Sequence, residues 1–236
     1  MTTPFEIACA GYSVAADWYE GNSNDEVLLT LIGWQSNKQS YNDILSALVE
    51  QTGMSALVFD YSGHGDSSFD INETRPAQHF LEVIYAFDWL RNKYPNAKIS
   101  VMGASYGGFM ATQLTKYRSF DKLVLRCPAI YLPTDFYTLN SIIQSEEGWA
   151  AKDAFRRDSE ALAGHPLLAR ASNFKGKTLV VVHENDEDIP KATTDAYIKT
   201  FNADSYIAEG FPHSLHTMPK ERVATYQAAI ADWLNR

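Results

Sequence analysis

A serine stands at the centre of the run GASYGG (residues 103–108), which fits the pattern Gly-x-Ser-x-Gly. The apolar segment 98–103 before it predicts a strand, and the segment after it predicts a helix. In so sharp a turn between strand and helix, the serine must adopt a strained backbone and its neighbours must be small. The N–H groups at the start of the helix would face the turn and favour developing negative charge. The pattern therefore predicts that Ser105 is a nucleophile.

A serine hydroxyl is a weak nucleophile until a base takes its proton, and histidine titrates in the range that this task requires. The segment AEGFPHSLHTMP (residues 208–219) contains two histidines near the end of the chain. His213 follows a short predicted strand and precedes the last predicted helix, and we expect it to be the base. His216, three residues later, is the alternative. We assign structural roles to the other histidines, which are His64, His79, His165 and His183.

Such a histidine needs a carboxylate that fixes its tautomer and stabilises the imidazolium ion. The segment VVVHENDEDIP (residues 180–190) ends a predicted strand in four acidic residues. We expect Glu184 and Glu187 to be solvated, as is usual for charged residues on a loop. Asp186 and Asp188 remain as the candidates.

The elements that must position these residues alternate along the chain. Short apolar runs predict strands buried on both faces, and they lie at 26–33, 55–61, 98–103, 121–127 and 177–183. Between them, 77–94 and 222–234 repeat apolar residues at helical spacing, while 5–20 predicts two antiparallel strands that turn near Gly11. This order predicts an α/β architecture with a mostly parallel sheet, whose functional residues follow the carboxyl ends of the strands.

The chain resembles the α/β-hydrolase superfamily, in particular its serine-nucleophile members of esterase or lipase type. Besides the serine turn, FDYSGHGDSS (59–68) resembles the family's Asp-x-x-Gly-x-Gly-x-Ser loop, and LIGWQSNKQSYND (31–43) resembles the loop that forms part of its oxyanion hole. The resemblance covers nearly the whole length. It implies the α/β-hydrolase fold, with helices on both faces of a mostly parallel central sheet. It also implies one domain, 1–236, with a small helical cap inserted at about 129–174.

The resemblance also implies roles for particular residues. The family often places its acid four residues before a proline, which favours Asp186 relative to Pro190. Its histidine loop resembles the surroundings of His213. The backbone N–H groups of Tyr106 and Trp34 are the expected oxyanion donors, with Gln35 next to Trp34 as the second choice. No metal and no organic cofactor is expected.

A serine nucleophile in this superfamily implies ester, thioester or amide substrates and an acyl-serine intermediate. We expect a carboxylesterase that acts on small to medium acyl groups or aromatic esters, because the insertion contains aromatic residues suited to lining a pocket, namely Tyr131, Phe136, Tyr137, Trp149 and Phe155. The insertion's charged residues, including Arg156, Arg157 and Asp158, are expected to be solvated. The alternatives are a serine aminopeptidase or amidase, a thioesterase, an acyltransferase, or a non-catalytic binding protein with the same fold.

The composition excludes other classes of function. The chain has 236 residues, of which 45% are apolar and 21% charged, and its formal charge is −9. It lacks the basic cluster that nucleic acids or anionic membranes require. The sequence shows no signal peptide and no apolar stretch long enough to span a bilayer, so we expect a cytoplasmic protein whose partner is a small-molecule ester. Cys9 and Cys127 are expected to be packed thiols rather than a disulfide.

Overall fold

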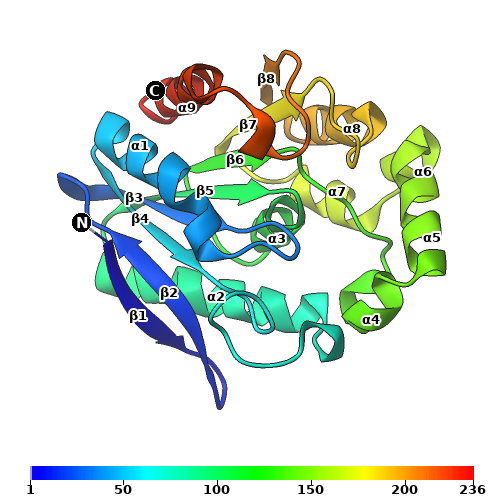
Figure 1. The fold of residues 1–236 in the computed structure, drawn as a ribbon, viewed down its shortest axis with the longest axis horizontal. Coiled ribbons are helices and arrows are strands. Elements are labelled where there is room, and N and C mark those ends of the chain that lie inside the picture. The colour runs from blue at the N-terminus through cyan, green and yellow to red at the C-terminus, as the bar shows by residue number, and fades with distance from the viewer. Residues whose placement is uncertain (1) are drawn as a thin grey trace.

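The computed structural model describes residues 2–236, which form one eight-stranded sheet in the order β1-β2-β4-β3-β5-β6-β7-β8 (Figure 1). The strands are β1 (Thr2–Ala8), β2 (Ser13–Tyr19), β3 (Ser23–Leu31), β4 (Met54–Phe59), β5 (Lys98–Ala104), β6 (Lys122–Arg126), β7 (Lys177–His183) and β8 (Asp204–Ala208). β2 is antiparallel to β1 and β4, and all other neighbours are parallel. The expected mostly parallel sheet with an antiparallel edge is therefore confirmed.

Helices cover both faces of the sheet. They are α1 (Asn42–Thr52), α2 (Pro76–Lys93), α3 (Tyr106–Leu114), α4 (Asn140–Ile143), α5 (Glu146–Arg157), α6 (Ser159–Ala163), α7 (Pro166–Ala171), α8 (Lys191–Phe201) and α9 (Lys220–Leu234). Short 3-10 helices lie at η1 (Lys38–Tyr41), η2 (Ile71–Glu73), η3 (Asp135–Tyr137) and η4 (Leu215–Thr217). α1 packs against α9, whereas α2 packs against α3, which in turn contacts α7 (Figure 1).

The buried strands explain the continuous apolar runs of the sequence. Every residue of β4 is buried, because helices cover both faces of the central sheet. The expected apolar stripe of α2 points inward through Phe80, Phe87 and Leu90. Both thiols are free, with Cys127 buried and Cys9 partly buried, as expected. Over Thr2–Arg236, no helix combines the length and the apolarity that crossing a membrane requires.

The segment between β6 and β7 forms η3 and α4 to α7, and Figure 1 shows α4, α5 and α6 together at one side of the molecule, far from β1. Hydrogen bonds tie it to the rest of the fold near its start and its middle: Asn140 N–H donates to the Thr74 carbonyl at 3.0 Å, and Thr193 Oγ1 donates to the Arg156 carbonyl at 2.9 Å. The expectation that Arg156 is solvated is wrong, because the inner face of α5 packs against α8 and leaves this residue 3% exposed.

The aromatic residues of this segment divide into two groups. Tyr131 is buried, and Phe136 and Phe155 pack partly buried against the core. Tyr137 and Trp149 are 73% and 42% exposed. These two side chains therefore lie on the surface, and Tyr137 in particular does not line an internal pocket.

Candidate active site

Ser105 occupies the turn between β5 and α3 with φ 51° and ψ −113°, a conformation that non-glycine residues rarely adopt. Two main-chain hydrogen bonds hold it there: Ser105 N–H donates to the Arg126 carbonyl, and the Ser105 carbonyl accepts from Ala129 N–H, both at 2.9 Å. A Cβ atom at Gly103 would lie 2.3 Å from the Gly107 carbonyl oxygen. The turn therefore closes only with glycine at position 103, as the sequence pattern predicts.

The loop after β3 lies directly beside this turn. A Cβ atom at Gly107 would lie 2.0 Å from the carbonyl oxygen of Leu31, so the start of α3 touches the end of β3. A Cβ atom at Gly33 would lie 3.8 Å from the Cβ of Ser105. The residue after Gly33 is Trp34, so the loop begins next to the serine side chain.

The two expected oxyanion donors come close together through this contact. The rings of Trp34 and Tyr106 meet edge to face, with centroids 5.5 Å apart. Within the described part of the chain, no hydrogen bond of either residue's backbone N–H to a protein acceptor is found. The Gly33 N–H, in contrast, already donates to the Tyr41 hydroxyl at 2.9 Å. Trp34 and Tyr106 thus have free backbone donors near Ser105.

The structure brings His213 and Asp186 together. His213 Nδ1 lies 2.8 Å from Asp186 Oδ2, and the other Asp186 oxygen accepts the N–H groups of Asp188 and Ile189 at 2.9 and 2.8 Å. Burial alone would raise the pKa of Asp186, but the hydrogen bond and charge of His213, with the two N–H donors, hold that pKa below its usual value. His216 is exposed and lies in η4.

The two glutamates of the acidic run are exposed, as expected, yet both contact the loop that carries His213. Glu184 accepts the Gly210 N–H at 2.8 Å, and Glu187 accepts the backbone N–H of His213 at 3.2 Å. These carboxylates therefore connect the loop after β7 to the loop after β8. Local sequence patterns could not indicate these contacts, because α8 and β8 separate the two loops along the chain.

The end of β6 lies between the serine turn and the His213–Asp186 pair. Arg126, the last residue of β6, accepts the N–H of Ser105. The next residue is Cys127, whose Sγ lies with an Asp186 oxygen and a His213 nitrogen in a group of atoms within 4.8 Å of one another. β6 thus links the nucleophile candidate to the base and acid candidates.

The same three side chains are the metal-ligand cluster found among residues 2–236. Burial raises the pKa of the Cys127 thiol well above its usual value, so the sulfur stays protonated. Asp186 and His213 already bond each other. Since a metal requires a thiolate and free ligand atoms, the arrangement fits a hydrogen-bonded pair with a packed thiol better than a metal site.

A series of buried hydrogen bonds holds the loop that carries His213. His183 Nδ1 lies 2.6 Å from the carbonyl oxygen of Pro212, the residue before His213, so this nitrogen donates. His183 Nε2 then accepts from the Tyr226 hydroxyl at 3.0 Å, and that hydroxyl accepts from Arg126 Nε at 2.7 Å. Burial, together with the charge of Arg126, lowers the pKa of His183 to about 4, so the ring is neutral at neutral pH.

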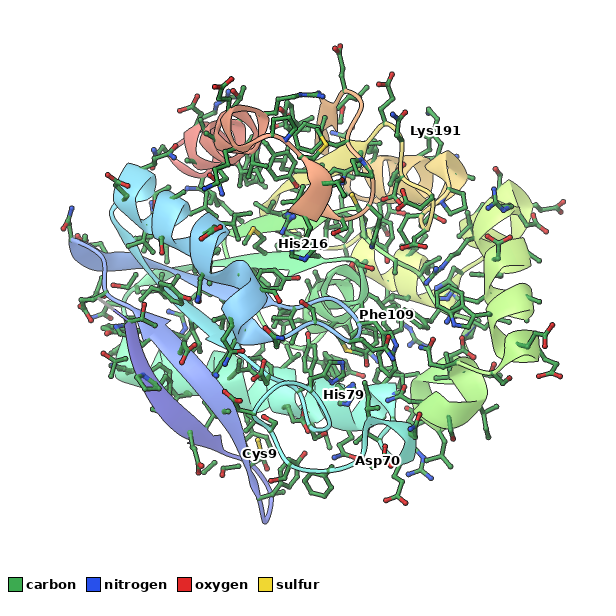
Figure 2. All side chains as sticks on the ribbon, viewed as in Figure 1. Cys9, Asp70, His79, Phe109, Lys191 and His216 are labelled. Carbon is green, nitrogen blue, oxygen red and sulfur yellow. The ribbon has the colours of Figure 1, made fainter. Side chains whose placement is uncertain are left out.

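A second buried histidine contacts the residue after the nucleophile candidate. His79 Nδ1 accepts from the Tyr106 hydroxyl at 2.7 Å, and His79 Nε2 donates to the Ser62 carbonyl at 3.0 Å. Figure 2 labels His79 on α2, in the interior of the molecule. Sequence reasoning gave His79 and His183 structural roles and missed both contacts, because nothing in their local spacing indicates the distant partners.

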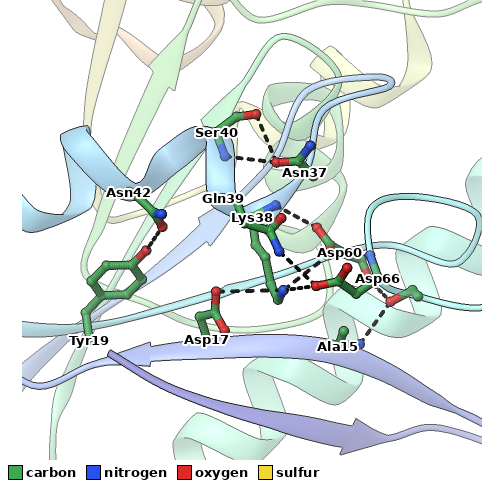
Figure 3. Close-up of polar contacts among 11 residues, drawn as sticks. Ala15, Asp17, Tyr19, Asn37, Lys38, Gln39, Ser40, Asn42, Asp60 and Asp66 are labelled. Atoms are coloured by element: carbon green, nitrogen blue, oxygen red, sulfur yellow. Dashed lines mark hydrogen bonds and ion pairs between the residues drawn. The ribbon is translucent and has the colours of Figure 1, made fainter. Parts of the chain in front are cut away.

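The loop after β3 is also anchored by a buried lysine (Figure 3). Lys38 Nζ lies 3.8 Å from Asp17, 3.8 Å from Asp60 and 2.5 Å from Asp66. The backbone N–H of Lys38 donates to Asp60 Oδ1 at 2.6 Å, while Asp66 N–H donates to Asp60 Oδ2 at 2.9 Å. This cluster joins β2 and the loops after β3 and β4, and so fixes the segment that contains Trp34.

A surface hollow lies away from Ser105. It has a volume of about 330 Å³ and is lined by residues near the amino ends of β3 and β4, including Tyr19, Glu20 and Glu50. In an α/β sheet, chemistry takes place at the carboxyl ends of the strands. We therefore assign the candidate site to Ser105 and its neighbours.

Comparisons with known proteins agree with this architecture. Residues 22–161 match the family model described as serine aminopeptidase, S33. Over 110 residues the chain is 30% identical to proline iminopeptidase PfmaB of Pestalotiopsis fici, a match covering 45% of this chain and 37% of that protein. Over 189 residues it is 24% identical to an uncharacterized protein of Mycobacterium tuberculosis, covering 77% and 60%. The chain thus spans less than two thirds of the length of these relatives.

Solved structures match nearly the whole chain. Est1E of Butyrivibrio proteoclasticus, solved with ferulic acid bound, superposes with a TM-score of 0.73 at 14% identity, covering 96% of this chain and 97% of that one. A monoacylglycerol lipase of Paleococcus ferrophilus gives a TM-score of 0.71 at 15% identity, covering 94% and 98%. At these identities the likeness shows a shared fold.

Proposed function

The chain belongs to the serine aminopeptidase S33 family of α/β hydrolases, and we propose that it hydrolyses carboxylic esters with Ser105, His213 and Asp186 as catalytic residues. The family membership confirms the superfamily and the fold that the sequence resembles, and it supports the proposal that the protein is an α/β serine hydrolase. The ester substrate and the role of each residue belong to the proposal.

The proposed reaction gives each group one role. Ser105 Oγ attacks the ester carbonyl while His213 accepts its proton, and Asp186 stabilises the imidazolium ion that forms. The N–H groups of Tyr106 and Trp34 donate to the developing oxyanion. His213 then returns the proton to the departing alcohol. Water, deprotonated by His213, finally attacks the acyl-serine and releases the acid.

The observation that carries the proposal is the 2.8 Å contact between His213 Nδ1 and Asp186 Oδ2. It directs the acceptor lone pair of His213 to Nε2, the atom that must take a proton from serine. The strained φ of 51° at Ser105 supports the same reading, since backbone strain of this kind clusters at active sites.

We further propose that residues 129–174 act as a cap over the site. The segment begins after β6, beside the serine turn, where Ala129 N–H donates to the Ser105 carbonyl, and it ends before β7. Its buried Tyr131 packs edge to face on Tyr106, with centroids 5.5 Å apart. Aromatic side chains at this place favour a small to medium acyl group or an aromatic ester, and Est1E was solved with an aromatic acid bound.

An aminopeptidase is the second candidate, because the family model and one relative carry that description. Such an enzyme must bind the ammonium group of its substrate, which requires carboxylates or other acceptors near the site. The buried charged residues of α5 are instead the cations Lys152 and Arg156. These two buried cations of α5 favour the ester over the aminopeptidase proposal.

Hydrolysis of matched substrates tests the choice. We expect the protein to release 4-nitrophenol from 4-nitrophenyl esters at a much higher kcat/KM than it releases 4-nitroaniline from aminoacyl 4-nitroanilides. Ser105→Ala should abolish both activities and leave the circular dichroism spectrum unchanged. A higher kcat/KM on the anilides would contradict the ester proposal, and full ester activity in Ser105→Ala would contradict the mechanism.

A further inference from the structure

Two cations are buried one helical turn apart on the inner face of α5. Lys152 is 0% exposed and Arg156 is 3% exposed. The adjacent Arg157, in contrast, lies on the outer face and forms an exposed ion pair with Asp153. Long charged side chains are rarely fully buried unless a group of opposite charge accompanies them.

Neither cation has a close carboxylate partner. The ion pairs of Thr2–Arg236 include neither Lys152 nor Arg156. Lys152 Nζ makes one long contact, 3.4 Å to the Ile143 carbonyl, and lies 3.9 Å from the ring centroid of Trp149. Arg156 Nε donates to the Ile130 carbonyl at 2.9 Å. Burial and the charge of Arg156 lower the pKa of Lys152 to about 8, which is what an ammonium without a counter-ion shows.

The charges of the groups around Lys152 and Arg156 do not balance. Asp135 acts on both cations, and its own burial raises its pKa. Asp153 also acts on Arg156, but it forms its ion pair with the exposed Arg157 and is thereby neutralised. One carboxylate against two cations leaves one positive charge over. An uncompensated buried charge is costly, and the chain is otherwise rich in acids, with a net charge of −9. The surplus therefore matches one singly charged anion from outside the chain.

The ring of Tyr131 connects the two cations to the residue that follows the proposed nucleophile. Both contact the ring of Tyr131, with Lys152 Nζ 5.1 Å and Arg156 Cζ 5.3 Å from its centroid. The same ring packs on Tyr106, the residue after Ser105. The side chain of Tyr131 thus contacts both cations on one side and the residue after Ser105 on the other.

We propose that Lys152 and Arg156 bind a carboxylate of the substrate, so that the enzyme prefers esters whose acyl chain ends in a free carboxylate, the half-esters of dicarboxylic acids. This inference rests on the proposed ester hydrolysis at Ser105. A carboxylate carries the single negative charge that the surplus requires, whereas a phosphate monoester carries about two. The carboxylate takes the place of the Trp149 ring as the partner of the ammonium, and Trp149 is a surface side chain, 42% exposed.

The test uses a pair of substrates that differ only in the charge at the far end. These are the 4-nitrophenyl half-ester of adipic acid and the same compound with its free carboxylate methylated, with the uncatalysed release of 4-nitrophenol subtracted. The measured quantity is the ratio of kcat/KM for the half-ester to kcat/KM for the methylated diester. The variants are Arg156→Gln, Lys152→Met and, as the matched control on the same helix, Arg157→Gln.

We expect the wild-type ratio to exceed about ten, Arg156→Gln and Lys152→Met each to lower it about tenfold, and Arg157→Gln to leave it unchanged. A wild-type ratio at or below one would overturn the proposal, and so would an equal ratio in all the variants that fold. If one variant fails to fold, the other variant and the wild-type ratio still decide. Failure of the proposed function is a separate result, in which the wild type releases 4-nitrophenol from neither substrate.

Discussion

The imidazole of His213 contacts Asp186 and Asp188 differently, although the two carboxylates are only two residues apart. His213 Nδ1 lies 2.8 Å from Asp186, whose side chain is 4% exposed, whereas His213 Nε2 lies 4.0 Å from Asp188, whose side chain is 52% exposed. A buried carboxylate bonded at Nδ1 fixes the tautomer, and an exposed one at 4.0 Å contributes little in water. The geometry thus favours Asp186 as the acid.

Exchange of each aspartate for asparagine tests this preference. Asp186→Asn should lower kcat on a 4-nitrophenyl ester on the order of 10³-fold to 10⁴-fold, because the neutral amide no longer stabilises the imidazolium ion and permits the wrong tautomer. Asp188→Asn should change kcat by less than about threefold. The reverse order of the two losses would assign the acid to Asp188.

Hydrogen bonds run from Arg126 through Tyr226 and His183 to the Pro212 carbonyl. We therefore predict that His183 positions His213. His183→Ala should lower kcat about tenfold or more while KM changes little, since the loss concerns the base and not the substrate pocket. His183→Asn retains a donor for the Pro212 carbonyl and should restore most of kcat. Steady-state kinetics of both variants, with thermal melting as a check of folding, gives the comparison. Equal kcat values for the two variants would show that the hydrogen bond to Pro212 has no such role.

Because Lys38 is buried among three aspartates, we predict that its replacement lowers the free energy of unfolding strongly. Lys38→Met would leave the buried Asp17 and Asp60 without their cation, and breaking a buried ion pair in this way costs about 3–5 kcal/mol of the free energy of unfolding. Lys191→Met removes an ion pair whose lysine side chain is 80% exposed and should change that free energy by less than about 1 kcal/mol. Urea unfolding of the two variants measures both values. Equal losses would contradict the anchoring role of Lys38.

From the burial of His64 we predict that the free energy of unfolding falls in acid. The residue is 3% exposed, and burial lowers its pKa to about 4 from the usual 6.5. Because the folded-state pKa is the lower one, the stabilisation is complete above pH 6.5 and is lost as the pH falls from about 6.5 to about 4, amounting to about 3 kcal/mol. His64→Phe should reduce the fall in unfolding free energy between about pH 7 and about pH 5. If the fall in unfolding free energy were the same in His64→Phe, groups other than His64 would cause it.

The sequence predicts the sheet and the serine turn well, because both depend on local patterns. The fully buried β4 reads as a continuous apolar run, and the requirement for glycine at position 103 is visible in Gly-x-Ser-x-Gly. The choice of Asp186 depended on its distance from Pro190, and its contact with His213 appears only in the fold.

The supporting contacts could not be predicted, because their partners are far apart in the chain. His79 and Ser62 are on different elements, and His183 meets Pro212 only after α8 and β8 have intervened. Arg156 looks like a surface residue, because it neighbours Arg157 in a strongly charged helix. Its burial follows from the packing of α5 against α8. Tertiary packing of this kind has no local pattern.

The most direct test of an activated nucleophile at Ser105 is the intact mass of the protein after reaction with a fluorophosphonate. The probe forms a bond only with a serine whose proton a base removes. We predict one adduct on the wild type, located on the peptide that contains Ser105, no adduct on Ser105→Ala, and much slower labelling of Asp186→Asn. A wild type that gains no adduct, or an adduct that persists in Ser105→Ala, would contradict the proposed catalytic role of Ser105.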